Sequence, residues 1–256
     1  MRLLKRIFRG GAVPSAPARF DAPMAPAARL AVVGDIHGCA DLLENLLAQL
    51  ETAAPERLVF VGDYIDRGED SARVLERLHT LARAEGSRAV FLKGNHEEMM
   101  LHFLDAPGAQ AARWLRHGGL QTLASFGIGG FGARPDEARA VQARDALARA
   151  LGPEMLAWLR ALPTSFISGN IAVVHAAANP GKPIAAQSEQ ALLWGHPAFA
   201  TTPRTDGVWV VHGHTIVDAV QPEAGRIGVD TGAYATGRLS AALLDGTDMK
   251  VLTAPD

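Results

Sequence analysis

Three short apolar runs, each ending in a glycine and a polar residue, constrain this chain more than any other feature of its sequence. They are Leu30–Val33 before Gly34-Asp35, Leu58–Val61 before Gly62-Asp63, and Ala89–Lys93 before Gly94-Asn95. Leucines at helical spacing lie between them, in residues 40–52 and 71–85. This β-α-β-α-β order predicts parallel strands joined by crossover helices. We therefore expect the three polar strand ends to share one sheet edge, where α/β sheets bind ligands.

The rest of the chain divides into a helical middle and a strand-rich end. The apolar spacing in residues 97–162 predicts mainly helices. These helices would form an insert that could cap the sheet edge. Strand signals return after Pro163 and suggest a second sheet; they lie at Ile171–Val174, Val208–Val211, Arg226–Val229 and Leu239–Leu244. Residues 10–28 are rich in alanine, proline and glycine, and we predict a flexible tail, residues 1–28, ahead of one domain, residues 29–256.

Composition and charge argue against several classes of protein. The 256 residues carry 25 Lys and Arg against 27 Asp and Glu, so we expect no nucleic acid partner. A lone cysteine, Cys39, allows no intrachain disulfide and no thiolate zinc site. No run approaches the roughly 18 to 20 apolar residues of a membrane span, so we expect a cytoplasmic protein without stable membrane insertion. Residues 1–9 contain four basic residues among apolar ones. This segment is expected to be either a frayed terminus or a short turn that lies on an anionic membrane.

Carboxylates, an amide and imidazoles gather at the predicted strand ends. The candidates are Asp35, His37, Asp63, Asp66, Arg67, Asn95, His96, His175, His212 and His214. An isolated aspartate or histidine at such a position is usually structural, but five strand ends together offer oxygen and nitrogen ligands. This set without thiolates suits Mn²⁺, Fe or Zn²⁺ better than an all-oxygen cage for Ca²⁺ or Mg²⁺. Because the groups outnumber the ligands of one tetrahedral ion, we predict two metals bridged by one carboxylate.

Three complete motifs resemble a known family. They are Gly34-Asp35-Ile36-His37-Gly38, Gly62-Asp63-Tyr64-Ile65-Asp66-Arg67-Gly68 and Gly94-Asn95-His96-Glu97, followed by His175 and Gly213-His214-Thr215. In this order they resemble the phosphoprotein phosphatase branch of the calcineurin-like metallophosphoesterases, in particular the small bacterial and phage serine/threonine protein phosphatases and the diadenosine tetraphosphatases. Trp114, Gly118-Gly119 and Thr122-Leu123 look like the helical insert of the bacterial members. The resemblance implies an α/β fold, a β-sandwich of two mixed sheets flanked by helices with a dimetal site at one sheet edge.

The resemblance also implies a role for each matching residue. The first metal would be bound by Asp35, His37 and Asp63, and the second by Asp63, Asn95, His175 and His214, with Asp63 as the bridge. His96 would be the general acid, held by Asp66. Arg67 and Asn95 would bind the substrate phosphate, and Arg204 is the nearest candidate for a second phosphate-binding arginine.

The implied activity is hydrolysis of a phosphomonoester by direct attack of a metal-bridging hydroxide on phosphorus. A serine/threonine protein phosphatase acting on a phosphoprotein or a small phosphoester is the first reading, with Mn²⁺ expected to serve in vitro and Fe or Zn²⁺ as alternatives. A bis(5'-nucleosyl)-tetraphosphatase is the second, and a metal-binding scaffold without catalysis is the third. The helical middle offers few aromatic rings for stacking a base, which favours the first; they are Phe103, Trp114, Phe126, Phe131 and Trp158.

The sequence around Gly213, Glu97 and Asp230 has local interpretations. Gly213 allows a turn between two histidines, so His214 is the expected ligand and His212 packs beneath it or bonds a carboxylate. Glu97 is expected to support the site or to cap a helix, and Asp230 to lie in a turn.

Overall fold

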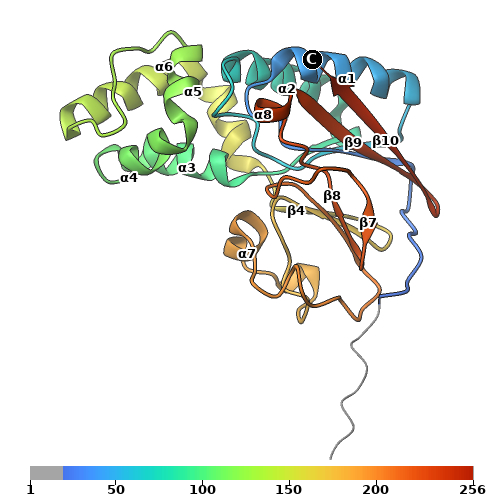
Figure 1. Cartoon of the computed structure of the whole chain (residues 1–256). Coiled ribbons are helices and arrows are strands. Elements are labelled where there is room, and N and C mark those ends of the chain that lie inside the picture. The colour runs from blue at the N-terminus through green and yellow to red at the C-terminus, as the bar shows by residue number, and fades with distance from the viewer. Residues whose placement is uncertain (1–19, 256) are drawn as a thin grey trace, which may run out of the picture.

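Two five-stranded sheets lie at the centre of the structure, a computed structural model that describes residues 20–255 (Figure 1). The first sheet has the order β10-β9-β1-β2-β3 and the second the order β4-β5-β6-β8-β7. The first contains β1 (Leu30–Val33), β2 (Arg57–Phe60), β3 (Ala89–Phe91), β9 (Arg238–Asp245) and β10 (Asp248–Pro255). The second contains β4 (Ser165–Ser168), β5 (Ile171–Val174), β6 (Trp209–His212), β7 (Pro222–Glu223) and β8 (Arg226–Gly228).

Both sheets are mixed. Strands β1, β2 and β3 pair in parallel, as predicted, because α1 (Ala40–Ala53) and α2 (Ser71–Glu85) return the chain between them. Strands β9 and β10 add to β1 in antiparallel fashion. In the second sheet β5, β6 and β8 are parallel, whereas β4 and β7 are antiparallel to their neighbours. The expected α/β fold with two mixed sheets flanked by helices is confirmed.

Strand β1 of the first sheet is buried on both faces. In β1, Leu30 and Val32 join an apolar cluster with Ile171 of the second sheet, whereas Ala31 and Val33 belong to the cluster that contains the α1 leucines. Successive side chains of a strand point to opposite faces, so a strand covered on both sides needs apolar residues throughout. This burial explains the continuous apolar runs of the sequence.

A helical insert connects β3 to β4 and lies beside the first sheet (Figure 1). Its α-helices are α3 (Asn95–Asp105), α4 (Pro107–Trp114), α5 (Leu120–Ser125) and α6 (Glu137–Ala161). A π-helical turn, Leu115–Gly119, joins α4 to α5. Two short helices, α7 (Glu189–Trp194) and α8 (Ala233–Thr236), lie in later loops, and 3-10 turns occur at Gly86–Arg88 and Ile184–Ala186. Among the described residues, none of the helices combines the length and the hydrophobicity of a membrane-spanning segment.

The structure corrects the assignment of strands near the C-terminus. Leu239–Leu244 is predicted to join the second sheet, but β9 pairs with β1 of the first, with Leu30 opposite Leu244. The reason is that the chain turns at α8 and returns along the free side of β1. Strands β4 and β10 and helix α5 are not predicted from the sequence. Strand β10 is an edge strand with exposed residues on much of its length, so it lacks a clear apolar pattern.

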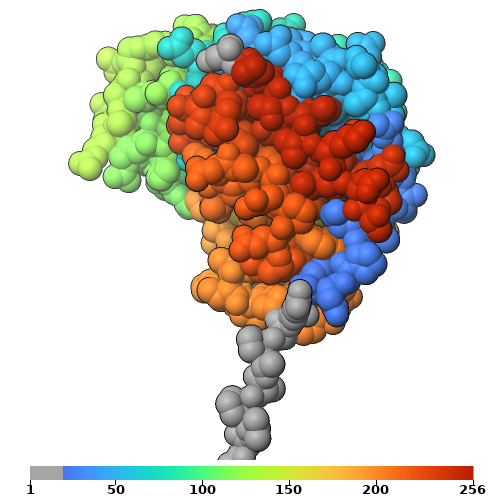
Figure 2. All heavy atoms as spheres, turned by 45° about the vertical axis from the view of Figure 1, so that its right-hand side comes forward, coloured from blue at the N-terminus to red at the C-terminus, as the bar shows by residue number. Residues whose placement is uncertain are grey.

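The predicted tail also differs in part from the structure. Residues 1–19 lie outside the described residues, but residues 20–28 lie against the second sheet, where Figure 2 shows them beside the C-terminal half. Asn170 Oδ1 accepts the Ala25 backbone N–H at 2.8 Å, and its Nδ2 donates to the carbonyls of Pro23 and Gly207 at 2.9 and 3.1 Å. The chain approaches so closely that a Cβ on Gly169 would lie 2.0 Å from the Ala25 carbonyl oxygen.

These bonds predict the effect of Asn170→Ala. Removing one side chain leaves three backbone groups without this partner, so the free energy of unfolding should fall by about 1–3 kcal/mol. Chemical denaturation measures this change. Gln221→Ala, at an exposed position, is the matched control and should stay within about 0.5 kcal/mol of the parent protein. A loss for Asn170→Ala no larger than that of the control would contradict the role of this segment in the fold.

Candidate active site

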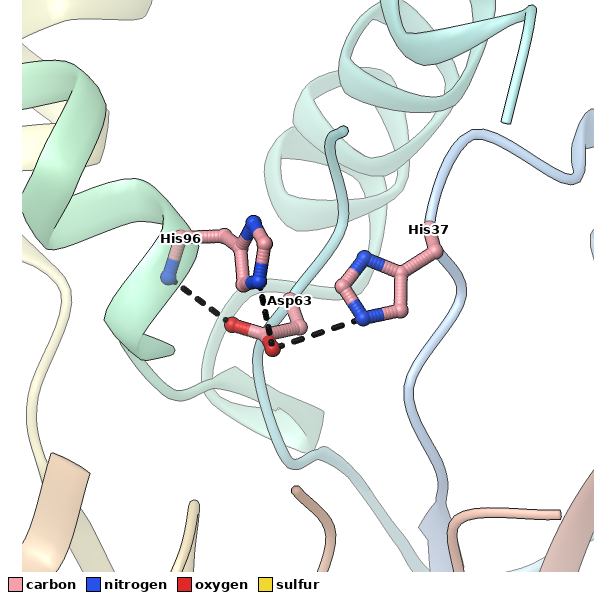
Figure 3. Close-up of side chains that lie close together, drawn as sticks. All are labelled: His37, Asp63 and His96. Carbon is pink, nitrogen blue, oxygen red and sulfur yellow. Dashed lines mark hydrogen bonds and ion pairs between the residues drawn. The ribbon is translucent and has the colours of Figure 1, made fainter. Parts of the chain in front are cut away.

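The carboxyl ends of five strands deliver polar side chains to one place. Asp35 and His37 follow β1, Asp63 follows β2, Asn95 and His96 begin α3 after β3, His175 follows β5, and His214 follows β6. Figure 3 shows His37, Asp63 and His96 converging from three separate segments. Three of these residues have the left-handed φ values that non-glycine residues rarely adopt, His37 at 46°, Asp63 at 53° and His214 at 63°. Such strained turns cluster at functional sites.

Asp63 lies at the centre of the cluster. Its Oδ2 is 3.5 Å from His37 Nε2 and 3.9 Å from His96 Nε2, and its Oδ1 is 3.4 Å from His175 Nε2. Asn95 Oδ1 lies 2.8 Å from His175 Nε2 and 2.9 Å from His214 Nδ1. Two groups of ligand atoms lie close enough to hold a metal ion, His37–Asp63–His96 and Asp63–His175–His214, and Asp63 belongs to both.

The electrostatics of the cluster fit bound cations. Asp35 Oδ1 is buried and has no hydrogen-bond partner among residues 20–255. Burial and the carboxylates of Asp230 and Asp63 raise the pKa of Asp35 well above its usual value. A buried group of like charges is unfavourable unless an opposite charge neutralises it. Divalent metal ions would supply that charge.

The imidazoles of the cluster are suited to binding metal. Burial lowers the pKa of His37 to about 3 and that of His175 to about 4, so both rings are neutral near pH 7 and keep a free lone pair. Burial alone would raise the pKa of Asp63, but the imidazoles of His175, His96 and His37 hold it below its usual range. The set of ionised carboxylate, amide oxygen and neutral imidazoles is one that Mn, Fe and Zn ions accept.

Glu97 supports the turn that carries Asp63. Its buried carboxylate accepts backbone N–H groups from Asp63 at 2.8 Å, Tyr64 at 2.8 Å and Gly94 at 2.9 Å. Burial and the nearby Asp63 raise the pKa of Glu97 to about 7. The fit is close, because a Cβ on Gly94 would lie 2.1 Å from Asp63 Oδ1. Glu97 therefore both caps α3 and ties it to the turn after β2, as its position suggested.

His96 and Asp66 form a buried pair next to the cluster. Their Nδ1 and Oδ2 atoms are 2.6 Å apart. Burial alone would lower the pKa of His96, but the carboxylates of Asp63 and Asp66 raise it above its usual value. A protonated imidazole that a carboxylate holds in place can act as a general acid.

Arg67 lies at the exposed mouth of the site. Its Nη2 atom is 3.3 Å from His96 Nε2, and its Nη1 donates to the Tyr234 hydroxyl at 2.9 Å. The guanidinium carbon is 4.8 Å from the centre of the Tyr234 ring, which also meets the His37 ring edge to face at 5.2 Å. An exposed guanidinium beside a buried group of possible metal ligands can hold an anion such as a phosphate. Tyr234 was not found from the sequence, because its one signal is an aromatic residue in a turn of small residues.

One candidate, Arg204, has other partners. Arg204 is buried and donates to Asp206, to the Asn179 carbonyl at 3.1 Å and to the Lys182 carbonyl at 3.0 Å. None of its hydrogen bonds within residues 20–255 reaches the cluster, so the structure does not bring it to the site. The physical reason is that Asp206, two residues away, and the loop carbonyls take up its donors.

His212 and His214 have different surroundings, as the turn expected at Gly213 suggested. His212 Nδ1 lies 3.0 Å from the Gly213 carbonyl oxygen, and its ring packs edge to face on Phe199 with centroids 5.0 Å apart. His214 instead meets Asn95. A Cβ on Gly213 would lie 2.0 Å from Asp35 Oδ1, so only glycine fits between the two. Asp230 accepts the Gly232 backbone N–H at 2.8 Å in a turn, and burial raises its pKa to about 6.

Comparisons with known proteins agree on one family. Residues 28–218 match the family model of the calcineurin-like phosphoesterases. A symmetrical bis(5'-nucleosyl)-tetraphosphatase of Aromatoleum aromaticum is 33% identical over 150 residues, 58% of this chain and 44% of that protein. Serine/threonine-protein phosphatase 2 of Salmonella typhimurium is 27% identical over 221 residues, 82% of this chain and 89% of that protein.

A solved structure shares the fold. It belongs to a protein provisionally assigned as a diadenosine tetraphosphatase and aligns with a TM-score of 0.61 at 23% identity, over 91% of this chain and 99% of that one. The matches to the first three curated relatives cover 44%, 37% and 38% of their lengths, less than half in each case.

The geometry predicts different outcomes for two alanine variants. His214→Ala should lower bound Mn²⁺ from two ions per chain toward one, because it removes an imidazole from the group that surrounds Asp63 and Asn95. His212→Ala should retain two ions, since its ring packs on Phe199. Elemental analysis after equilibrium dialysis measures both. The reverse order of severity would move the ligand assignment to His212.

Proposed function

Because this chain belongs to the calcineurin-like phosphoesterase family, we propose that it is a metal-dependent phosphatase that hydrolyses phosphoserine or phosphothreonine monoesters in proteins. The observation that carries the proposal is the buried His96–Asp66 pair, placed between the metal-binding cluster and the exposed Arg67. The cluster, the acid and the phosphate-binding arginine are the parts that hydrolysis of a phosphomonoester needs.

The proposed ligands divide into two sets that share Asp63. One metal would be held by Asp35, His37 and Asp63, and the other by Asp63, Asn95, His175 and His214. When bound, such ions neutralise the negative charge of a phosphate ester and activate water for attack. Arg67 holds the phosphate oxygens from the exposed side, and its planar fork matches their geometry. The Asn95 side chain lies between His175 and His214, where its amide can orient the phosphate.

His96 delivers the proton to the leaving group. Asp66 holds its Nδ1, so Nε2 is the atom that faces Asp63 and Arg67. The alkoxide of serine or threonine is a strong base and leaves poorly without a proton, whereas a nucleoside diphosphate is a weak base and leaves readily. A general acid held in position, such as His96, therefore accelerates hydrolysis most when the leaving group is the alkoxide of an alcohol. The Salmonella phosphatase supports the same reading, because the similarity spans most of both chains.

Cleavage of a dinucleoside tetraphosphate is the second candidate. The Aromatoleum relative is a symmetrical bis(5'-nucleosyl)-tetraphosphatase, and Tyr234, 39% exposed beside Arg67, offers one ring on which a base could stack. The helical insert offers less, since Phe103 and Trp114 are fully buried. Phe126, Phe131 and Trp158 are partly buried against the core.

A side-by-side assay separates the two candidates. The full chain loaded with Mn²⁺ is given a phosphothreonine peptide and diadenosine tetraphosphate at equal concentrations. We expect a larger kcat/KM for the peptide. A larger value for the tetraphosphate would assign the second function, and no hydrolysis of either by a protein that carries two metal ions would refute the phosphatase proposal.

A further prediction concerns His96→Asn. Metal content should stay near two ions per chain, while kcat on the phosphothreonine peptide should fall by about 10²- to 10⁴-fold, the usual range for a lost general acid. An aryl phosphate should lose less, because its phenolate needs little protonation. His102→Asn, at an exposed position on the same helix α3, is the control and should behave as the parent. Equal losses on both substrates would show that His96 serves another purpose.

A further inference from the structure

The helical insert makes direct hydrogen bonds to the acid pair. Trp114 at the end of α4 donates its Nε1–H to the Asp66 carboxylate, at 3.1 Å from Oδ1 and 3.0 Å from Oδ2. Thr122 of α5 donates its hydroxyl to Asp66 Oδ1 at 2.6 Å. Both side chains are fully buried, as is Asp66. The carboxylate that holds His96 is therefore also held by two side chains of the insert.

The insert also fixes the backbone of this segment. Asp66 and Arg67 have left-handed φ values of 72° and 71°. The Asp66 N–H donates to both Thr122 Oγ1 at 3.0 Å and Ser71 Oγ at 3.1 Å. The Thr122 hydroxyl thus accepts from the main chain of Asp66 and donates to its side chain. Non-glycine residues keep such a conformation only where their surroundings over-determine it.

The π-helical turn is what brings the two donors together. Eight residues of continuous α-helix would separate Trp114 from Thr122 by about 12 Å along the axis, too far for both to reach one carboxylate. Instead, His117 and Gly118 leave the helical conformation, and Gly118 takes a φ of 112°. A Cβ on Gly118 would lie 2.5 Å from the Arg67 nitrogen and 2.9 Å from Asp66 Cβ. The turn is therefore packed directly on Asp66 and Arg67.

The two donors fix the position of the Asp66 carboxylate beside the His96 ring. Without them the carboxylate would lose three of the hydrogen bonds that hold it next to Nδ1. The His96 ring would then lose the orientation that presents Nε2 to the leaving group.

We infer that Trp114 and Thr122 are positioning residues for acid catalysis: they hold the Asp66 carboxylate so that His96 presents its proton to the leaving oxygen, and the helical insert is in this way a required part of the reaction. The inference deepens the proposed function and rests on it for the role of His96. It predicts that loss of either donor affects poor leaving groups selectively. A residue that only stabilised the fold would lower turnover of every substrate alike.

Thr122 offers the cleaner pair of variants. Thr122→Val keeps the shape and removes the hydroxyl, whereas Thr122→Ser keeps the hydroxyl. On a phosphothreonine peptide, we expect Thr122→Val to lose about 10- to 100-fold in kcat, the range typical of residues that orient a functional side chain. On an aryl phosphate its loss should stay below about 3-fold, and Thr122→Ser should stay below that limit on both substrates. Metal content should equal that of the parent.

A spectroscopic measurement tests the same contact without turnover. In the metal-free protein, proton NMR should show a downfield resonance from the short His96 Nδ1–H···Asp66 bond, identified by its loss in His96→Asn. Thr122→Val and Trp114→Phe should move this resonance, because the carboxylate is no longer held in the same position beside Nδ1, and Thr122→Ser should leave it in place. Trp114→Phe places a smaller ring in a buried position and could destabilise the fold, so it is interpreted only together with the two Thr122 variants. Thermal unfolding shows whether each variant is folded.

The outcomes separate this inference from the proposed function. An inactive but metal-loaded parent protein would refute the phosphatase proposal, and the NMR comparison would still decide whether Thr122 and Trp114 govern the pair. An active parent with unchanged kcat and an unmoved resonance in Thr122→Val would overturn the inference alone. Equal losses on the two substrates with an unmoved resonance would also overturn it, because that is the result of a purely structural role.

Discussion

Buried negative charge at one sheet edge is the constraint on which the rest of the structure depends. The carboxyl groups of Asp35, Asp63 and Glu97 are almost completely buried, and burying such groups is unfavourable unless each is paired or hydrogen-bonded. Imidazoles surround Asp63, and three backbone N–H groups satisfy Glu97. Asp35 keeps one oxygen without a partner within residues 20–255. The left-handed turns and the glycines next to carboxylates are tolerated here because they bring together a set of side chains that could hold a cation.

The parts of the fold that follow from burial could be predicted from the sequence. Leu30–Val33 and Ile171–Val174 are strands because both faces are covered, and apolar runs report this directly. The edge strand β10 is not covered in this way, so its pattern is mixed. Likewise, the convergence of the strand-end residues follows from parallel topology. The hydrogen bonds of Arg204 could not be predicted in this way. They depend on a loop whose carbonyl groups come near the guanidinium, and such a loop leaves no periodic signal in the sequence.

The helical insert shows where prediction from pattern stops. Its helices follow from apolar spacing, and its expected place was a cap over the sheet edge. Its contact with Asp66 depends instead on a local departure from helical geometry at Gly118, which no periodicity reports. Tyr234 is a similar case, since it meets Arg67 across 167 positions of sequence. In both places the tertiary arrangement of single side chains, and not the type of element, decides what the site contains.

The segment at residues 20–28 has a practical consequence for attaching other molecules to this protein. Phe20 packs edge to face on Trp209 at the start of β6, whereas the candidate ligand His214 follows the other end of the same strand. Material joined upstream of Phe20 therefore enters at the end of the sheet opposite the active site. The other terminus differs, because Pro255 pairs with Arg238, close to α8 and Tyr234. An affinity tag, a fluorophore or a surface linkage placed before Phe20 would leave the mouth of the site open, whereas one placed after Pro255 would crowd it.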